Sequence, residues 1–264
     1  MNKIRLFFLL RRNTKLSERR HPMFEANQYG RLFGYIMIGF VAIELIALGT
    51  FFGWLGATED VPELIFLLVP FLLAFDFGAR FMTQQTPLML VKPYLLTPIS
   101  KFSAIECFLV GQLADLGNLV WMLLFVPYAF VVWCGGLGGW TVLAMLLLLH
   151  LMVLVNSQWY LMVRTLVNQH LLWWLLPAAL YGSMVLPFVV LSDATAEKLF
   201  DSIGDVLAHY GFSWWALAVE GVLFVALFAL NRYMQMHLVY DEIAKNEATR
   251  LGHVSEFRAL NRSS

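Results

Sequence analysis

The sequence predicts an all-α, polytopic membrane helix bundle that crosses the bilayer about six times. Of the 264 residues, 60% are hydrophobic and only 14% are charged, and the mean hydropathy is +0.70. Water-soluble domains of this size do not carry such a balance. A hydrocarbon core of about 30 Å requires about 20 mostly apolar residues per helix. Runs of about that length occur at approximately 33–54, 61–82, 102–126, 140–163, 171–191 and 212–231.

The distribution of basic residues predicts the orientation of this bundle. When the N-terminus is placed in the cytoplasm, every Lys and Arg except Lys198 falls on the cytoplasmic side. The outer loops carry acidic groups instead, among them Glu59 and Asp193. This is the positive-inside pattern. It predicts a six-helix transmembrane domain over 31–232 with both termini in the cytoplasm.

Three segments outside the predicted spans differ from them in composition. Residues 1–30 mix basic and apolar side chains without reaching span length, which predicts a segment that lies in the membrane interface. Basic residues beside a first span mark orientation and contact with anionic lipid, so we expect no nucleic-acid binding. Residues 194–210 place apolar side chains at helical spacing, which predicts an amphipathic helix on the outer face. Residues 233–264 are polar and are expected to form a cytoplasmic tail.

The cytoplasmic connection 83–101 is longer than a simple turn requires. Pro87, Pro93 and Pro98 divide it into short pieces, because each proline removes a backbone donor and biases the residue before it away from a helix. Its two short apolar clusters make it a candidate docking surface for a partner. An ordinary interfacial connector is the alternative interpretation.

Ionisable residues inside the spans are the candidate functional groups. Each costs about 2.5–3.5 kcal/mol at the bilayer centre on insertion scales and should therefore face protein or water. Asp76 and Arg80 are four residues apart, a spacing that predicts a structural or gating ion pair on one helix face. Glu106, one turn into the third span, could simply reach the cytoplasmic headgroups. The other candidates are Glu44, Asp76, Arg80, Asp115, His150 and Glu220.

Asp115 lies about half-way through the third span among small and polar residues, so we expect it to be buried in the bundle. Glu44 and Glu220 lie well inside the first and sixth spans, and either could pair with His150 or Asp115. Structural polar packing, a substrate path and proton coupling remain open interpretations for these groups.

The sequence contains no recognisable catalytic or metal-binding motif. His150 has no other His or Cys at ligand spacing, and Cys107 and Cys134 are expected near opposite membrane faces. There is no His-Glu-x-x-His, no Gly-x-Ser-x-Gly elbow and no Gly-x-x-x-x-Gly-Lys-Ser/Thr loop. We therefore expect no enzyme activity, no metal and no cofactor in this chain.

The segment from Ala79 to Val110, ARFMTQQTPLMLVKPYLLTPISKFSAIECFLV, resembles the corresponding stretch of a bacterial family of uncharacterised membrane proteins classed with type-2 ABC exporter permeases. In that family an Arg ends the second span, a Gln and a Pro follow, and a Pro-Tyr-Leu-Leu-x-Pro-Ile core leads into the third span. The matching residues are Arg80, Gln84 or Gln85, Pro87, Pro93, Tyr94, Leu95, Leu96, Pro98 and Ile99.

The resemblance implies a permease subunit of the bacterial inner membrane that couples ATP hydrolysis by a separate ABC ATPase to export. ATP–Mg would be bound by that partner and not by this chain. Members of the family are markedly longer, which implies an N-terminal half, or a short member that pairs with a second half or a second copy. The coupling contact would be made by Pro87, Lys92, Pro93, Tyr94, Leu95, Leu96 and Pro98.

Two other functions remain as alternatives to the transport subunit. One is a proton-coupled carrier or membrane-embedded enzyme that uses Asp115, Glu44 and His150. The other is a scaffold that assembles other proteins.

Overall fold

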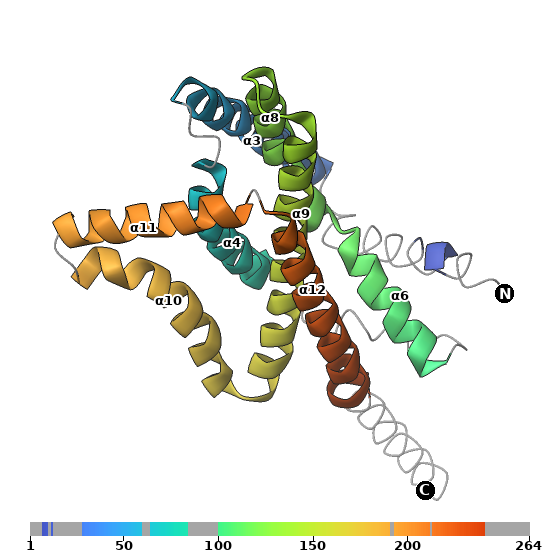
Figure 1. The fold of residues 1–264 in the computed structure, drawn as a ribbon. Coiled ribbons are helices and arrows are strands. Elements are labelled where there is room, and N and C mark those ends of the chain that lie inside the picture. Colours follow the sequence, from blue (N-terminus) through green and yellow to red (C-terminus); the bar gives the residue numbers. More distant parts are fainter. Residues whose placement is uncertain are drawn as a thin grey trace, which may run out of the picture.

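The computed structural model describes residues 7–9, 12, 28–59, 64–83, 100–190, 193–211 and 213–240, and the regular structure in these ranges is helical throughout (Figure 1). The all-α prediction is therefore confirmed. The helices, in chain order, are α3 (Gln28–Thr58), α4 (Leu64–Thr83), α6 (Lys101–Leu113), α7 (Leu116–Leu119), α8 (Met122–Cys134), α9 (Gly139–Gln169), the 3-10 turn η1 (Leu171–Trp174), α10 (Leu175–Val190), α11 (Asp193–Gly211), α12 (Trp214–Met234) and its π-helical continuation η2 (Gln235–Tyr240).

Four helices are long and apolar enough to cross a membrane by length and composition. Helices of this kind indicate a multi-pass membrane protein. They correspond to the first, second, fourth and sixth runs expected from the sequence. Their apolar stretches are Tyr35–Thr58, Leu64–Met82, Gly139–Gln169 and Trp214–Val239.

The third expected run forms a bent pair of segments. The stretches Ile105–Leu119 and Met122–Cys134 meet at an angle of 60°, and together they would make a fifth span. The helix breaks where α6 ends, because the backbone of Asp115 is extended, with φ −70° and ψ 149°. Gly117 and Asn118 come two and three residues after Asp115, and these residue types have low helix propensity.

The fifth expected run, 171–191, begins with the turn η1 and continues as α10, which has 16 residues. That length is below the roughly 20 residues that a straight span requires. By length and composition alone, the described chain therefore has four spanning helices, or five if the bent pair is one span.

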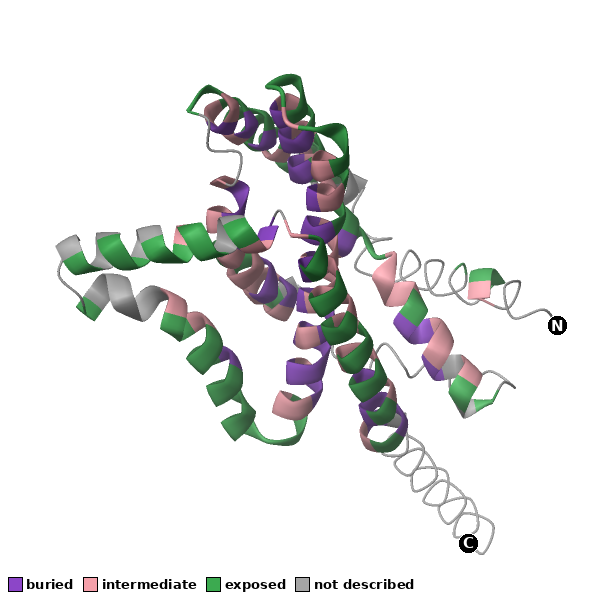
Figure 2. Cartoon of the chain, viewed as in Figure 1, coloured by how far each residue is buried: buried purple, intermediate pink, exposed green. Residues whose placement is uncertain are grey.

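Helix α9 forms the axis of the bundle. In Figure 1, α4, α8 and α12 run beside it, and α3 packs on the outer side of α8. Figure 2 shows that the buried residues follow α4, α8 and α9, whereas α10 and much of α12 are exposed. The centre of the apolar core is formed by Ile65, Phe66, Val69, Leu124, Phe125, Tyr128, Met145, Leu148, Leu149 and Val153.

Small residues allow α3 and α8 to approach closely. A side chain at Gly49 would overlap the carbonyl group of Leu124, and one at Gly53 would come within 3.0 Å of the carbonyl oxygen of Tyr128. The two contacts advance by four residues on both helices, so α3 and α8 run parallel. Small residues four apart are a common device for packing helices in membranes, where water does not drive helices together.

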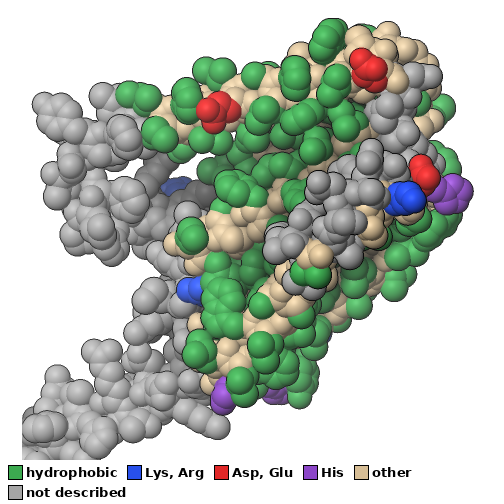
Figure 3. Space-filling view, turned by 90° about the vertical axis from the view of Figure 1, so that its left-hand side faces the viewer, with side chains coloured by type: hydrophobic (Ala, Val, Ile, Leu, Met, Phe, Trp, Pro, Cys, Tyr) green, Lys and Arg blue, Asp and Glu red, His purple; other side chains and the backbone are tan. Residues whose placement is uncertain are grey.

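Helix α11 connects the far end of α10 to the start of α12 and lies across the bundle (Figure 1). It occupies the segment in which the sequence predicts an amphipathic helix, 194–210. It contacts α4 closely, since a side chain at Gly211 would overlap the ring of Phe66. The face that contains α10 and α11 is covered mainly by hydrophobic side chains (Figure 3).

Candidate functional site

A buried ion pair on α4 is the centre of the candidate site. Asp76 and Arg80 lie one helical turn apart, and the Arg80 Nε donates to Asp76 Oδ2 at 2.7 Å. The two residues are only 5% and 4% exposed. The spacing of four residues predicted this contact, and the structure contains it.

The Asp76 carboxylate accepts hydrogen bonds from two further helices. Trp121, just before α8, donates through Nε1 to Oδ1 at 2.9 Å. Asn156 on α9 donates through Nδ2 to Oδ2 at 2.8 Å. Hydrogen bonds to an ionised group are roughly twice as strong as neutral ones, so Asp76 holds α8 and α9 against α4.

The Arg80 guanidinium extends these contacts to α7. Its Nη2 donates to the Gly117 carbonyl and to Asn118 Oδ1, both at 2.9 Å, and its Nη1 donates to Ser157 Oγ at 3.3 Å. A buried charge requires such partners, because an unpaired one would be expelled from a medium of low dielectric. The planar fork of donors on arginine suits several acceptors at once.

Asn118 also stabilises the break between α6 and α7. Its Nδ2 donates to the carbonyl oxygens of Gln112 at 2.9 Å and Leu113 at 3.2 Å. Carbonyl groups at the end of a helix have no partner within that helix and must be satisfied where water is excluded. The side chain that accepts from Arg80 therefore also caps α6.

Asn156 brings α10 into the same network. Its Oδ1 accepts from the Tyr181 hydroxyl at 3.0 Å, and its Nδ2 also donates to the Leu73 carbonyl at 3.0 Å. We call the connected side chains the polar hub. Its members are Asp76, Arg80, Asn118, Trp121, Asn156, Ser157 and Tyr181.

A second group of buried polar side chains joins α9 to α12. Asn231 Nδ2 donates to both the carbonyl and the side-chain oxygen of Gln158, at 2.8 and 2.9 Å. One turn further on, Gln235 Nε2 donates to Thr165 Oγ1 at 2.9 Å. We call these contacts the α9–α12 polar ladder, which no spacing in the sequence predicts. The run Asn-Ser-Gln at 156–158, within an otherwise apolar helix, is the signal that marks it.

The expectation that Asp115 is buried in the bundle is wrong. Asp115 is exposed at the helix break, whereas Asn118 is 0% exposed. The expectation assumed one continuous helix, in which residues 111, 114, 115 and 118 share a face. Because the helix ends at Leu113, that periodicity is lost and Asn118 takes the buried position.

The remaining candidates lie apart from the hub. Glu44 is exposed on α3, and His150 on α9 is partly exposed, with Nδ1 buried and without a partner among the described residues. No hydrogen bond or ion pair within the described ranges joins Glu44, Asp115 and His150 to one another. The same ranges contain no group of three or more His, Cys, Asp or Glu residues that could hold a metal ion.

Glu220 pairs with the corner between α11 and α12. Its Oε1 accepts from the Tyr210 hydroxyl at 3.1 Å. Burial raises the pKa of Tyr210, and the nearby Glu220 carboxylate raises it further. Glu106 on α6 accepts from Arg232 on α12 at 2.9 Å, and both side chains are half-exposed.

The residues expected to contact an ATPase lie outside the described ranges. The positions concerned are Pro87, Lys92, Pro93, Tyr94, Leu95, Leu96 and Pro98.

One comparison with known proteins gives a match. A family model with the description "Family of unknown function (DUF5687)" matches residues 16–263. No curated protein and no solved structure matches the chain.

Proposed function

We propose that this chain, which belongs to the family of unknown function DUF5687, is the membrane permease subunit of an ABC exporter of the bacterial inner membrane. ATP–Mg is bound and hydrolysed by a separate ATPase, because the chain has no P-loop of its own. A second permease half or a second copy of this chain completes the pathway.

The polar hub carries this proposal. The segment that resembles the exporter permeases begins within α4, which ends at Thr83, and continues into α6, which begins at Lys101. Arg80 is the last charged residue of α4, and it bonds to Asn118, which caps the other end of α6. A force on the connection between α4 and α6 therefore acts on two helices that are joined to each other by the hydrogen bonds of Arg80 and Asn118.

The hub also offers a route by which such a force reaches the rest of the bundle. Asp76 and Arg80 contact Asn156 and Ser157 on α9, and Asn156 contacts Tyr181 on α10. Helix α9 in turn holds α12 through the α9–α12 polar ladder. Coupling in proteins travels through contacts of this kind when an element has two discrete arrangements.

The proposal includes six spans with both termini in the cytoplasm. Helix α10 is then a short fifth span, and α11 is the outer amphipathic helix between the fifth and sixth spans. An amphipathic helix at this place is also what the resemblance to type-2 exporters implies. The supporting observation is that α11 directly joins the short apolar α10 to the long apolar α12.

Co-purification tests the proposal. The chain is solubilised from its native membranes with a mild detergent, and its partners are identified by mass spectrometry. We expect an ABC ATPase that is lost when Tyr94, Leu95 and Leu96 are all replaced by Ala. Val206→Ala, an exposed position on α11, is the control and retains the ATPase. A complex without any ATPase, or one that is unaffected by the triple replacement, contradicts the proposal.

The proton-coupled carrier or membrane enzyme has weaker support. It requires Asp115, Glu44 and His150 to act together, and the contacts of the described residues do not join them. Transport or catalysis that is lost in Asp115→Asn and needs no ATPase would favour this alternative.

A further inference from the structure

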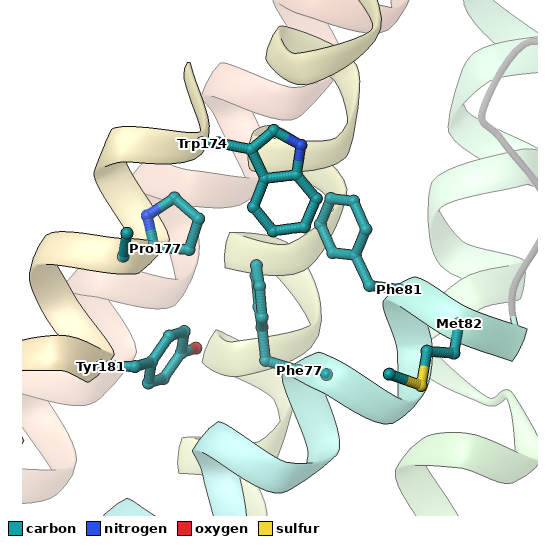
Figure 4. Close-up of a pocket in the computed structure, with 8 residues that line it drawn as sticks. Phe77, Phe81, Met82, Trp174, Pro177 and Tyr181 are labelled. Carbon is teal, nitrogen blue, oxygen red and sulfur yellow. The ribbon is translucent and has the colours of Figure 1, made fainter. Parts of the chain in front are cut away.

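An apolar pocket lies between α4 and α10. It has a volume of about 510 Å³, within the range of about 300–1,000 Å³ typical of ligand sites. One wall is formed by Phe77, Gly78, Phe81 and Met82, and the other by Trp174, Pro177, Ala178 and Tyr181. Figure 4 shows the rings of Phe77, Phe81, Trp174 and Tyr181 turned toward the same space.

The pocket lies where lipid would surround the protein. Both walls belong to apolar helices: one to the candidate span Leu64–Met82 and the other to the shorter apolar helix Leu171–Met184. Met82 at its edge is 90% exposed, so the pocket opens on the surface of the bundle. A molecule that enters from this side comes from the hydrocarbon region and not from water.

A positive charge lies directly against one wall. The Arg164 guanidinium carbon is 4.5 Å from the centre of the Phe81 ring, and its Nη1 donates weakly to the Phe81 carbonyl at 3.4 Å. Its Nε is buried and has no hydrogen-bond partner among the described residues. Because Nε is buried, a ligand could meet only the Nη groups of this side chain. A guanidinium beside an apolar pocket is complementary to a phosphate group that carries an acyl chain.

The open space continues at the backbone of α4. A side chain added at Gly78 would meet no atom within 4 Å. The wall at this position is therefore formed by helix backbone without a side chain, which leaves room for a flexible acyl chain.

We infer that this pocket binds one acyl chain of an anionic phospholipid, whose phosphate lies at Arg164. Under the orientation predicted from the basic residues, this is a lipid of the cytoplasmic leaflet. The site does not depend on the presence of an ATPase, so it stands or falls separately from the proposed function.

Photolabelling of the full chain tests this site. The protein is placed in phosphatidylcholine vesicles that contain a small fraction of phosphatidylglycerol with a diazirine on its acyl chain, and labelled peptides are identified by mass spectrometry. We expect adducts to concentrate in 77–82 and 174–181. Labelling by the same reagent with a phosphatidylcholine headgroup should be about fivefold weaker, the equivalent of about 1 kcal/mol for one basic residue.

Variants separate the acyl-chain contact from the headgroup contact. Gly78→Leu fills the pocket and lowers labelling by both reagents, and Ala178→Leu on the opposite wall does the same if the first variant is not monodisperse. Gly221→Leu on α12 is the matched control, because its new side chain also meets no atom within 4 Å but lies outside the pocket. Arg164→Gln removes the preference for phosphatidylglycerol, and Arg164→Lys retains it.

Several results would overturn the inference. Labelling spread evenly over the apolar helices, or unchanged in both pocket-filling variants, shows that no lipid site exists here. Cross-links from the pocket to another polypeptide identify a protein as the occupant. A preference for phosphatidylglycerol that is unchanged in Arg164→Gln shows that the phosphate does not lie at Arg164.

Discussion

At Arg80, one guanidinium makes four hydrogen bonds, one within α4 and three to two other helices, α7 and α9. They go to Asp76, to the Gly117 carbonyl, to Asn118 and to Ser157. A buried ion pair is not in itself a source of stability, because the desolvation of both charges offsets their attraction. The large effect arises when one partner is removed and the other is left buried and charged.

Arg80→Met should therefore destabilise the protein by about 3–5 kcal/mol. Unfolding of the purified protein by sodium dodecyl sulfate, followed by tryptophan fluorescence, measures this loss. Arg232→Met, which breaks the half-exposed pair with Glu106, should cost no more than about 1 kcal/mol. The double variant Asp76→Leu/Arg80→Met should regain most of the loss. Equal losses of stability in Arg80→Met and in Arg232→Met would contradict this account of the hub.

Asn118 and Asp115 should respond in opposite ways. Asn118→Leu removes the donor to the Gln112 and Leu113 carbonyls and an acceptor of Arg80, so we expect a loss of about 1–3 kcal/mol. Asp115→Asn changes an exposed residue and should remain within about 0.5 kcal/mol of the parent protein. The same unfolding assay compares them, and a larger loss in Asp115→Asn would show that Asp115 is the buried group.

The packing of α3 against α8 depends on glycines, which have no side chain and therefore let the two helices approach closely. Gly49 lies against the Leu124 carbonyl group, so a larger residue there must push the two helices apart. Overpacking of this kind costs about 1–3 kcal/mol or more.

Gly49→Leu should thus destabilise the bundle, whereas Gly39→Leu on the same helix should have little effect, because nothing lies within 4 Å of a side chain at Gly39. The thermal stability of both variants in detergent measures the difference. If Gly39→Leu is as damaging as Gly49→Leu, α3 has a contact at Gly39 beyond those in this chain.

The corner between α11 and α12 should respond to alkaline pH. Because burial and Glu220 raise the pKa of the Tyr210 hydroxyl, the neutral form is favoured in the folded protein. The stability from this group is complete below its ordinary pKa of about 10 and is lost as the pH rises through the raised value. The stability difference between the parent protein and Tyr210→Phe should therefore shrink above about pH 10. A difference that stays constant with pH would contradict the assignment.

Local spacing explains which parts of the fold and site could be predicted from the sequence. The Asp76–Arg80 contact follows from a separation of four residues within one helix, so no tertiary information was needed. The partners Trp121, Asn156 and Tyr181 come from other helices, and a single sequence does not contain the register between helices. Asp115 was misplaced because the helix ends at Leu113, where Asn118 caps α6 and also accepts from Arg80 on another helix, a contact that sequence spacing does not reveal.

For the whole molecule, α9 unites the two polar groups. Asn156 and Ser157 join the hub, and Gln158 and Thr165 join the ladder to α12. With 31 residues, α9 is longer than the roughly 20 that cross a hydrocarbon core, so it must tilt or extend beyond it.

Thiol labelling in intact cells tests the orientation of the whole bundle. Cys134 is an exposed free thiol at the end of α8, and Cys107 is partly buried in α6. With the N-terminus inside, a membrane-impermeant maleimide should label Cys134 in the Cys107→Ser variant. It should leave Cys107 unlabelled in the Cys134→Ser variant until the cells are opened. The reverse pattern would invert the topology.

The ion pair of the hub also has an electrical consequence. Moving one elementary charge through a potential of 100 mV changes the free energy by about 2.3 kcal/mol. Asp76 and Arg80 carry opposite charges, lie on one helix and are bonded at 2.7 Å, so they move together. When α4 moves along the membrane normal, both buried charges move with it. Because they are opposite, no net charge moves through the membrane potential. The hub can thus change position at the same energetic cost in an energised and in a depolarised membrane.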